Sequence, residues 1–248
     1  MIAVAGGKGG SGKTTTTLGL ARALSRRGAP VVAADADWDL PNLARLAAET
    51  RSEGPTEAGA EGPTEAGAEG PPVGGDRHAD GSDARTVLDA VRGTEPGRPG
   101  RSPPTVLAAP DAPRSVDADA TFDALDGMTP EGAPVLLDSP AGASPDVAAP
   151  LRAADRALIA TPLRRAALRD AAKTAAIAGR LDCPTVGAVV IGETDVPDRV
   201  GTLLGCPVLG AIPDGGAVPL SDPSVRSAYD GLASRLGETA AASEWQIA

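Results

Sequence analysis

The chain has 248 residues, a mass of 24.5 kDa and a formal net charge of −10, with 23 Lys and Arg against 33 Asp and Glu. Hydrophobic residues make up 42% of the chain, which is enough for a buried core and excludes disorder throughout. A chain this acidic has no long-range attraction for phosphate backbones or anionic lipids. Nucleic acid is therefore not an expected partner.

Two further properties concern where the protein works. No apolar run is long enough to cross a bilayer, and the first residues lack the basic region and cleavage site of a signal peptide. The sequence therefore predicts a soluble, cytoplasmic protein. Only three of the 23 basic residues are lysines, and this Lys-poor, Asp-rich composition is typical of halophilic proteins. A GC-rich genome produces a similar bias.

The first part of the chain alternates between apolar strands and amphipathic helices. Residues 2–5 form a short apolar run that predicts a strand, and a glycine-rich segment follows it directly. Leucines and alanines then recur at helical spacing up to Gly28. A second strand is expected over 30–34, followed by a short helical pattern through Leu43 and Leu46. This order predicts a parallel α/β arrangement.

A low-complexity segment interrupts this pattern. Residues 53–60 and 61–68 are the same octad, EGPTEAGA, and a third copy begins at Glu69. The segment has almost no apolar side chains to offset the entropy lost on ordering. A repeat array can form a solenoid or a partner-binding tract, but two octads without a buried face favour a disordered surface insertion at about 49–83. We expect this insertion within one domain that spans residues 1–248.

The α/β alternation resumes after the insertion. Helices are expected at 85–92, 164–181 and 225–236, and strands at 105–108, 133–137, 157–160, 185–191 and 207–212. The expected strands are apolar on both faces, as in a parallel sheet that helices cover on both sides. The predicted fold class is therefore α/β, with a mostly parallel twisted sheet and helices on both of its faces.

Residues 7–14 satisfy the P-loop pattern G-x-x-x-x-G-K-[ST] between the first strand and the first helix. Glycines allow backbone N–H groups to surround phosphate oxygens, Lys13 reaches the β- and γ-phosphates, and the Thr14 hydroxyl is a ligand for Mg²⁺. Asp138 ends an apolar strand and is expected to hold Mg²⁺ through water. The predicted phosphate-binding residues are Gly7, Lys8, Gly9, Gly10, Ser11, Gly12, Lys13, Thr14 and Thr15.

Three segments resemble one family of P-loop proteins. Residues 8–15, KGGSGKTT, resemble the deviant Walker A motif of the MinD/ParA ATPases, and Lys8 stands where that family has its second lysine. Residues 35–42 are similar to the family's switch I, and residues 138–142, DSPAG, are similar to switch II of the MinD branch. Weaker likeness covers nearly all of the chain except the octads.

The resemblance implies an ATPase that forms a homodimer with ATP and slowly hydrolyses it to switch its interaction with a protein partner. It implies that Lys8 reaches the phosphates of the other subunit and that Asp37 orients the attacking water. With Lys13, these two residues form the expected catalytic set. Thr14, Asp35 and Asp138 are the expected Mg²⁺ site, and ATP and Mg²⁺ are the expected cofactors.

The chain departs from the family in two places. Relatives often place Asn-Arg after the strand at 185–191 to read adenine, but this chain has Gly-Glu-Thr at 192–194, so we expect adenine recognition by backbone groups around Pro213 and Asp214. MinD proteins end in a basic amphipathic helix, whereas residues 237–248 are acidic, so membrane targeting is not supported.

Two other functions stay open. One is an ATP-dependent binding module with negligible turnover. The other is a ParA-type partitioning ATPase, which the lack of a basic surface disfavours. Trp38 and Asp39 also depart from the family, which commonly has glycine at position 39; they form a surface contact or a stiffened switch, or they have no role, and the sequence does not decide between these.

Overall fold

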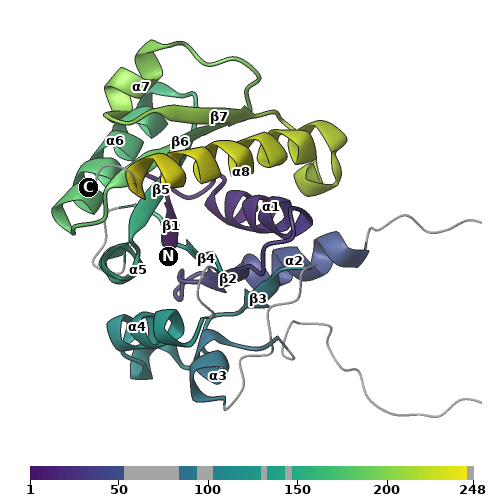
Figure 1. The fold of residues 1–248 in the computed structure, drawn as a ribbon, viewed down its shortest axis with the longest axis vertical. Coiled ribbons are helices and arrows are strands. Elements are labelled where there is room, and N and C mark those ends of the chain that lie inside the picture. The colour runs from purple at the N-terminus through teal and green to yellow at the C-terminus, as the bar shows by residue number, and fades with distance from the viewer. Residues whose placement is uncertain (53–83, 94–102, 130–132, 143–146, 245–248) are drawn as a thin grey trace, which may run out of the picture.

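The computed structural model describes residues 1–52, 84–93, 103–129, 133–142 and 147–244 (Figure 1). In these ranges seven strands form one sheet in the order β3-β2-β4-β1-β5-β6-β7, and every neighbouring pair is parallel. The strands are β1 (Ile2–Ala5), β2 (Val32–Asp35), β3 (Thr105–Leu107), β4 (Val135–Asp138), β5 (Arg156–Pro162), β6 (Thr185–Ile191) and β7 (Val208–Ile212). The predicted α/β fold is confirmed, with a fully parallel sheet.

The helices are α1 (Lys13–Arg26), α2 (Leu43–Ser52), α3 (Val87–Arg92), α4 (Ala118–Met128), α5 (Ala148–Ala153), α6 (Arg165–Arg180), α7 (Arg199–Leu204) and α8 (Pro223–Glu244). Helices α1 to α7 lie in the connections between successive strands, and α8 follows the last strand. Because α2 extends to Ser52, the helix includes the first four residues of the predicted insertion, and residues 53–83 lie outside the described ranges. Among the described helices, none is long and apolar enough to cross a membrane.

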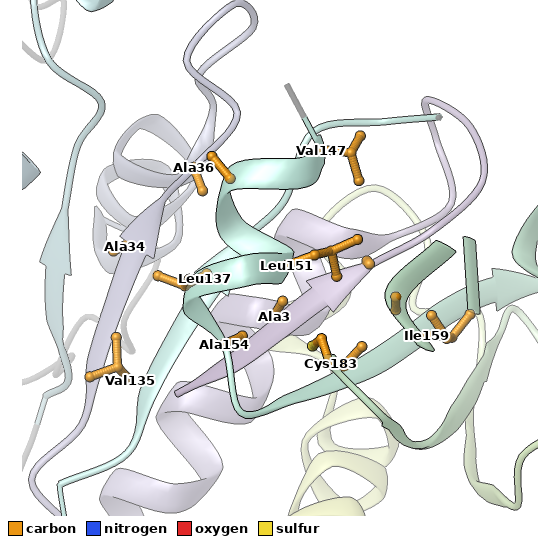
Figure 2. Close-up of a cluster of buried hydrophobic side chains, with 14 of the residues drawn as sticks. Ala3, Ala34, Ala36, Val135, Leu137, Val147, Leu151, Ala154, Ile159 and Cys183 are labelled. Carbon is orange, nitrogen blue, oxygen red and sulfur yellow. The ribbon is translucent and has the colours of Figure 1, made fainter. Parts of the chain in front are cut away.

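Both faces of the sheet are covered by helices. Successive residues of a strand point to opposite faces, so Ala3 and Val4 of β1 belong to different cores. Ala3 packs in the core that α3, α4, α5 and α6 cover, and Figure 2 shows part of it, with Leu137 of β4 and Leu151 of α5. Val4 packs in the second core, which α1, α2 and α8 cover. The glycine-rich motif therefore starts from a strand that is buried on both faces.

Helices α1 and α8 pack closely on the second face (Figure 1). Tyr229 of α8 is 1% exposed, and its hydroxyl lies 3.4 Å from Thr16 Oγ1 of α1. Burial raises the pKa of Tyr229 to about 12. Its ring lies against Gly19, where a Cβ atom would come within 2.4 Å of ring carbon Cε2. The absence of a side chain at Gly19 is what lets the two helices approach.

A Gly19→Ala variant should therefore be less stable by about 1–3 kcal/mol, because the added Cβ atom would overlap the buried ring of Tyr229. Urea unfolding at equilibrium measures this difference. The matched control is Gly179→Ala in α6, where a Cβ atom would meet nothing within 4 Å. Alanine is the better helix former, so this control should gain up to about 1 kcal/mol. Equal stability of the two variants would contradict close packing at Gly19.

Candidate functional site

The strand order brings three distant motifs to one edge of the sheet. Strands β2, β4 and β1 are neighbours, and Asp138 at the end of β4 pairs in register with Asp35 of β2 and with Val4 of β1. The glycine-rich loop leaves β1 directly after Ala5. Because parallel strands end at the same edge, the P-loop and both switch segments lie together there, as ligand sites do in open α/β sheets.

The loop between β1 and α1 is fixed at its base and open at its tip. A Cβ atom at Gly7 would come within 2.3 Å of Asp170 Cβ on α6, so the loop backbone packs directly against that helix. Gly10 and Gly12 have φ angles of +77° and +84°, which favour glycine. At Gly9 and Gly10 a Cβ atom would meet nothing within 4 Å. The loop therefore presents an open backbone at the positive end of α1.

Lys13 is the first residue of α1, and its side chain points into the protein. The residue is only 7% exposed, and none of the ion pairs within the described residues involves it. Burial lowers its pKa, and the charges of Asp138 and Asp37 oppose this shift. A buried ammonium beside the loop is a fixed positive charge for an anionic ligand.

Asp138 faces α1 from the end of β4. It is 1% exposed, and its Oδ1 lies 3.3 Å from the Thr17 hydroxyl, which also donates to the Lys13 carbonyl at 3.0 Å. Burial, together with the charge of Asp35, raises the pKa of Asp138 to about 7, and a hydrogen bond from Thr14 opposes this shift. Two of the three residues of the expected Mg²⁺ site, Thr14 and Asp138, therefore face each other.

Asp35 organises switch I. Its Oδ1 accepts the N–H of Asp37 at 3.0 Å, and its Oδ2 accepts the N–H groups of Asn42 and Leu43, both at 3.0 Å. Burial raises its pKa to about 6, although these three hydrogen bonds oppose the shift. The carboxylate thus holds the turn that carries Asp37 and the start of α2. Its participation in a Mg²⁺ shell stays a prediction.

Two other side chains fix the conformation of switch I. Asp37 is half-buried, and its Oδ1 accepts the N–H of Leu40 at 3.3 Å. Trp38 donates from Nε1 to the Asp35 carbonyl at 2.9 Å, and its ring centroid lies 5.3 Å from that of Phe122 in α4. Trp38 therefore attaches the switch to α4, a contact that gives this residue a structural role. Asp39 is exposed.

Lys8 lies on the solvent side of the loop. Its side chain is 68% exposed, and its Nζ lies 3.2 Å from Asp170 Oδ2 in α6. Lys173 approaches the other oxygen of the same carboxylate at 3.4 Å. Lys8 lowers the pKa of Asp170 by a hydrogen bond and by its charge. In the isolated chain, Lys8 is thus bound to its own α6 through an exposed ion pair of low strength.

The expected adenine-binding residues lie further along the same edge. Pro213 and Asp214 directly follow β7, and Asp214 Oδ1 accepts the N–H of Gly216 at 3.0 Å. Ile212, the last residue of β7, pairs with Ile191, and a Cβ atom at Gly12 would lie 3.1 Å from the Ile191 side chain. The ends of β6 and β7 therefore continue from the loop, and the role of residues 213 and 214 stays a prediction.

The side chains around the loop fit a Mg-nucleotide. In the described ranges, two buried side-chain oxygens have no hydrogen-bond partner, and both belong to this site: Ser11 Oγ in the loop and Ser139 Oγ next to Asp138. No cluster of three His, Cys, Asp or Glu side chains able to hold a metal occurs among the described residues. Mg²⁺ is commonly held by one or two carboxylates together with substrate phosphates, so a small donor set suits it.

The sequence missed two contacts of this site. Thr17 follows Lys13 by one helical turn, so helical spacing could have placed its hydroxyl on the same face of α1 as Lys13, but its contact with Asp138 is long-range. Asp170 is 162 residues from Lys8, and no local pattern connects them. The remaining predicted loop residues, Gly9 to Thr15, lie in the loop and the first turn of α1 as expected.

Comparison with known proteins gives a consistent result. The model of the CobQ/CobB/MinD/ParA nucleotide binding domain matches residues 2–242. An uncharacterized ATP-binding protein of Methanocaldococcus jannaschii is 28% identical over 239 residues, covering 92% of this chain and 76% of that protein. The cell division ATPase MinD of Pyrococcus furiosus matches with a TM-score of 0.71 at 20% identity, covering 96% of this chain and 98% of that chain.

A second solved structure extends the likeness in fold. The septum site-determining protein MinD of Pyrococcus horikoshii, complexed with Mg-ADP, matches with a TM-score of 0.70 at 19% identity over 96% of both chains. The family model covers nearly the whole chain, and the P-loop and both switch segments lie together in the fold. The chain therefore belongs to the CobQ/CobB/MinD/ParA nucleotide-binding family, as its resemblance to the MinD/ParA ATPases predicts.

Proposed function

We propose that this chain is a MinD-like ATPase that binds Mg-ATP, dimerises and slowly hydrolyses ATP to switch its interaction with a protein partner. The observation that carries the proposal is the meeting of buried Lys13, buried Asp138 and the switch I residue Asp37 at the ends of adjacent strands. The charges of both carboxylates act on Lys13. This is the arrangement that positioning and charge stabilisation of a phosphoryl group require.

Each side chain of the site has a distinct task in this proposal. The loop N–H groups and Lys13 hold the phosphates, and Thr14 and Asp138 hold Mg²⁺. The metal supplies positive charge to the phosphate oxygens when it is bound with ATP. Asp37 accepts a hydrogen bond from water and orients its oxygen toward the terminal phosphorus, and the products are ADP and inorganic phosphate. Asp35 acts by holding Asp37 in place.

Lys8 supplies the dependence on a second subunit. Its ammonium is exposed, and among the described residues its ion pair is with Asp170 and not with its own loop, so it can exchange this surface ion pair for a stronger contact with phosphate. A positive charge contributed across a dimer interface would stabilise charge that develops during transfer, as an arginine finger does. Binding of nucleotide and formation of the dimer would then depend on each other.

A surface beside both switch segments supports regulated binding of a protein partner. A cavity of about 280 Å³ is lined by Trp38 of switch I, Pro140 of switch II and Phe122 of α4. Leu40 of switch I, which is close to Trp38 in the sequence, is 72% exposed. Apolar residues of both segments therefore share one surface, and any movement of the switches on hydrolysis would change what a partner contacts.

The dimer switch is tested by sedimentation with Mg-ATP at high ionic strength. Asp37→Ala should keep ATP bound while hydrolysis stalls, so that a dimer of about twice the monomer mass accumulates. Lys8→Ala should remain monomeric, because two nucleotide-bearing faces repel when the cross-subunit cation is missing. Analytical ultracentrifugation of the wild type and both variants measures this directly.

The control for Lys8 is Lys173→Ala. Lys173 approaches the same carboxylate of Asp170 and is similarly exposed, but it lies on α6 outside the loop. Its removal should leave the sedimentation of the wild type unchanged. If the wild type hydrolyses ATP while all of these proteins remain monomers, the dimer switch is wrong and the chain is a monomeric nucleotide enzyme.

A further inference from the structure

A second cavity, of about 250 Å³, lies on the α1 and α2 side of the sheet, away from the P-loop. Its lining includes Arg22 and Arg26 from the second half of α1, Arg51 from the last turn of α2, and Pro104 just before β3. Because β3 begins next to Pro104, the cavity lies toward the start of the strands, whereas the P-loop lies at their ends. Arg22 follows Lys13 by nine residues of α1, a separation of roughly 13 Å.

The cavity carries positive charge that the described residues do not neutralise. Arg26 is paired with Asp230 at 2.7 Å, but neither Arg22 nor Arg51 takes part in any ion pair within the described ranges. The hydrogen bond that Arg22 makes there goes to a neutral group, the Thr50 hydroxyl. Burial lowers the pKa of Arg22, and the charges of Arg51 and Arg26 lower it further. In a chain of net charge −10, two guanidinium groups that have no ion pair among the described residues face one cavity.

These features define the ligand by its charge and its donors. Guanidinium groups present planar pairs of N–H donors that match the oxygens of phosphate. The two positive charges that have no ion pair among the described residues balance a dianion. The Thr50 hydroxyl donates to the Leu46 carbonyl at 2.7 Å and accepts from Arg22, so it positions this guanidinium group. We propose that the cavity between α1, α2 and β3 is a second anion site, which binds the phosphate group of a small molecule independently of the nucleotide loop.

Inorganic phosphate is the probe for this site, and the side-chain Nε–Hε signals of arginine in ¹H–¹⁵N NMR spectra of the full chain are the readout. The Nε–Hε signal that disappears in Arg22→Gln belongs to Arg22, and the one that disappears in Arg51→Gln belongs to Arg51. Phosphate binding in the cavity is therefore measured separately from phosphate binding at the P-loop. Both signals should shift saturably, with a Kd of about 1 mM or lower, the affinity that two or three charge-assisted hydrogen bonds provide. Absence of a saturable shift would overturn the proposal.

Two variants distinguish phosphate binding in the cavity from a general effect of the chain's net charge. Arg51 is exposed, so Arg51→Gln should fold normally and weaken phosphate binding at Arg22 at least tenfold. The matched control is Arg180→Gln, which removes an exposed arginine from the last turn of α6 and should not change the Kd. Equal affinities of Arg51→Gln and the wild type would show that the cavity does not bind phosphate.

Two further variants show what binds to the arginines of the cavity. Lys13→Ala should leave phosphate binding at Arg22 and Arg51 unchanged, because the site does not depend on the nucleotide loop. Deletion of residues 53–68, which contain glutamates of the octads, should also leave the Kd unchanged. If phosphate binds only after this deletion, the chain's own carboxylates occupy the arginines, and the proposal of a small phosphorylated ligand is overturned.

Discussion

Replacing Lys13 with alanine should weaken the binding of Mg-ATP by well over tenfold while the protein stays folded. The side chain is 7% exposed beside the loop, and no carboxylate of the described residues forms an ion pair with it. Its charge is therefore available to the β- and γ-phosphates, and each charge-assisted contact contributes about 1.5–3 kcal/mol. Isothermal titration calorimetry of the variant with Mg-ATP measures the loss.

Lys173→Ala provides the comparison for this measurement, since it removes a lysine that is exposed on α6. Its affinity for Mg-ATP should match that of the wild type. Lys13→Ala should retain the melting temperature of the unliganded wild type, because removal of the ammonium also removes the cost of its burial. An unchanged ATP affinity in the folded Lys13→Ala variant would contradict the assignment of the site.

Replacing Asp138 with asparagine should have opposite effects on stability and on activity. In the unliganded protein, burial and the charge of Asp35 raise the pKa of Asp138 to about 7, well above the usual value of 3.8. The folded state therefore binds a proton more tightly than the unfolded state, and the free energy of unfolding falls as the pH rises from about 4 to about 7. The shift of Asp35 to about 6 acts in the same direction.

At pH 8, the free energy of unfolding of Asp138→Asn, measured with urea, should therefore exceed that of the wild type by about 2 kcal/mol or more. This difference in stability should disappear near pH 4. Asp123→Asn, on the exposed side of α4, should show little effect at either pH. The same Asp138 variant should lose Mg²⁺-dependent ATP hydrolysis, because an amide is a poor ligand for this metal. A wild-type stability that is equal at pH 4 and pH 8 would contradict the raised pKa.

The sequence predicted those parts of the fold that are determined by patterns within short stretches of the chain. The P-loop pattern between a strand and a helix, and the aspartates at the ends of the strands that became β2 and β4, follow from short stretches of sequence. Helix α4 was missed because half of its apolar residues are alanines and aspartates separate Phe122, Leu125 and Met128, although Asp117 caps it by accepting the N–H of Ala120. Helices α5 and α7 have only six residues each, too few for a clear period.

Long-range contacts account for the rest of what the sequence did not reveal. The role of Trp38 depends on Phe122, which lies 84 residues away on a helix that the sequence did not predict. The pairing of Lys8 with Asp170 depends on α6 packing against Gly7, which follows from the topology of the sheet and not from either segment. Arg22 and Arg51 meet only because α1 and α2 pack against each other.

The position of β1 in the sheet also determines when the protein can assemble during translation. The strand β1 and the glycine loop leave the ribosome before the two strands that flank β1 in the sheet, because β4 and β5 end only at Asp138 and Pro162. At about 5–20 residues per second, β1 waits roughly 10 to 30 s for its second neighbour. A nascent chain that stops before β4 contains the complete glycine loop and has neither of the strands that hold it in place.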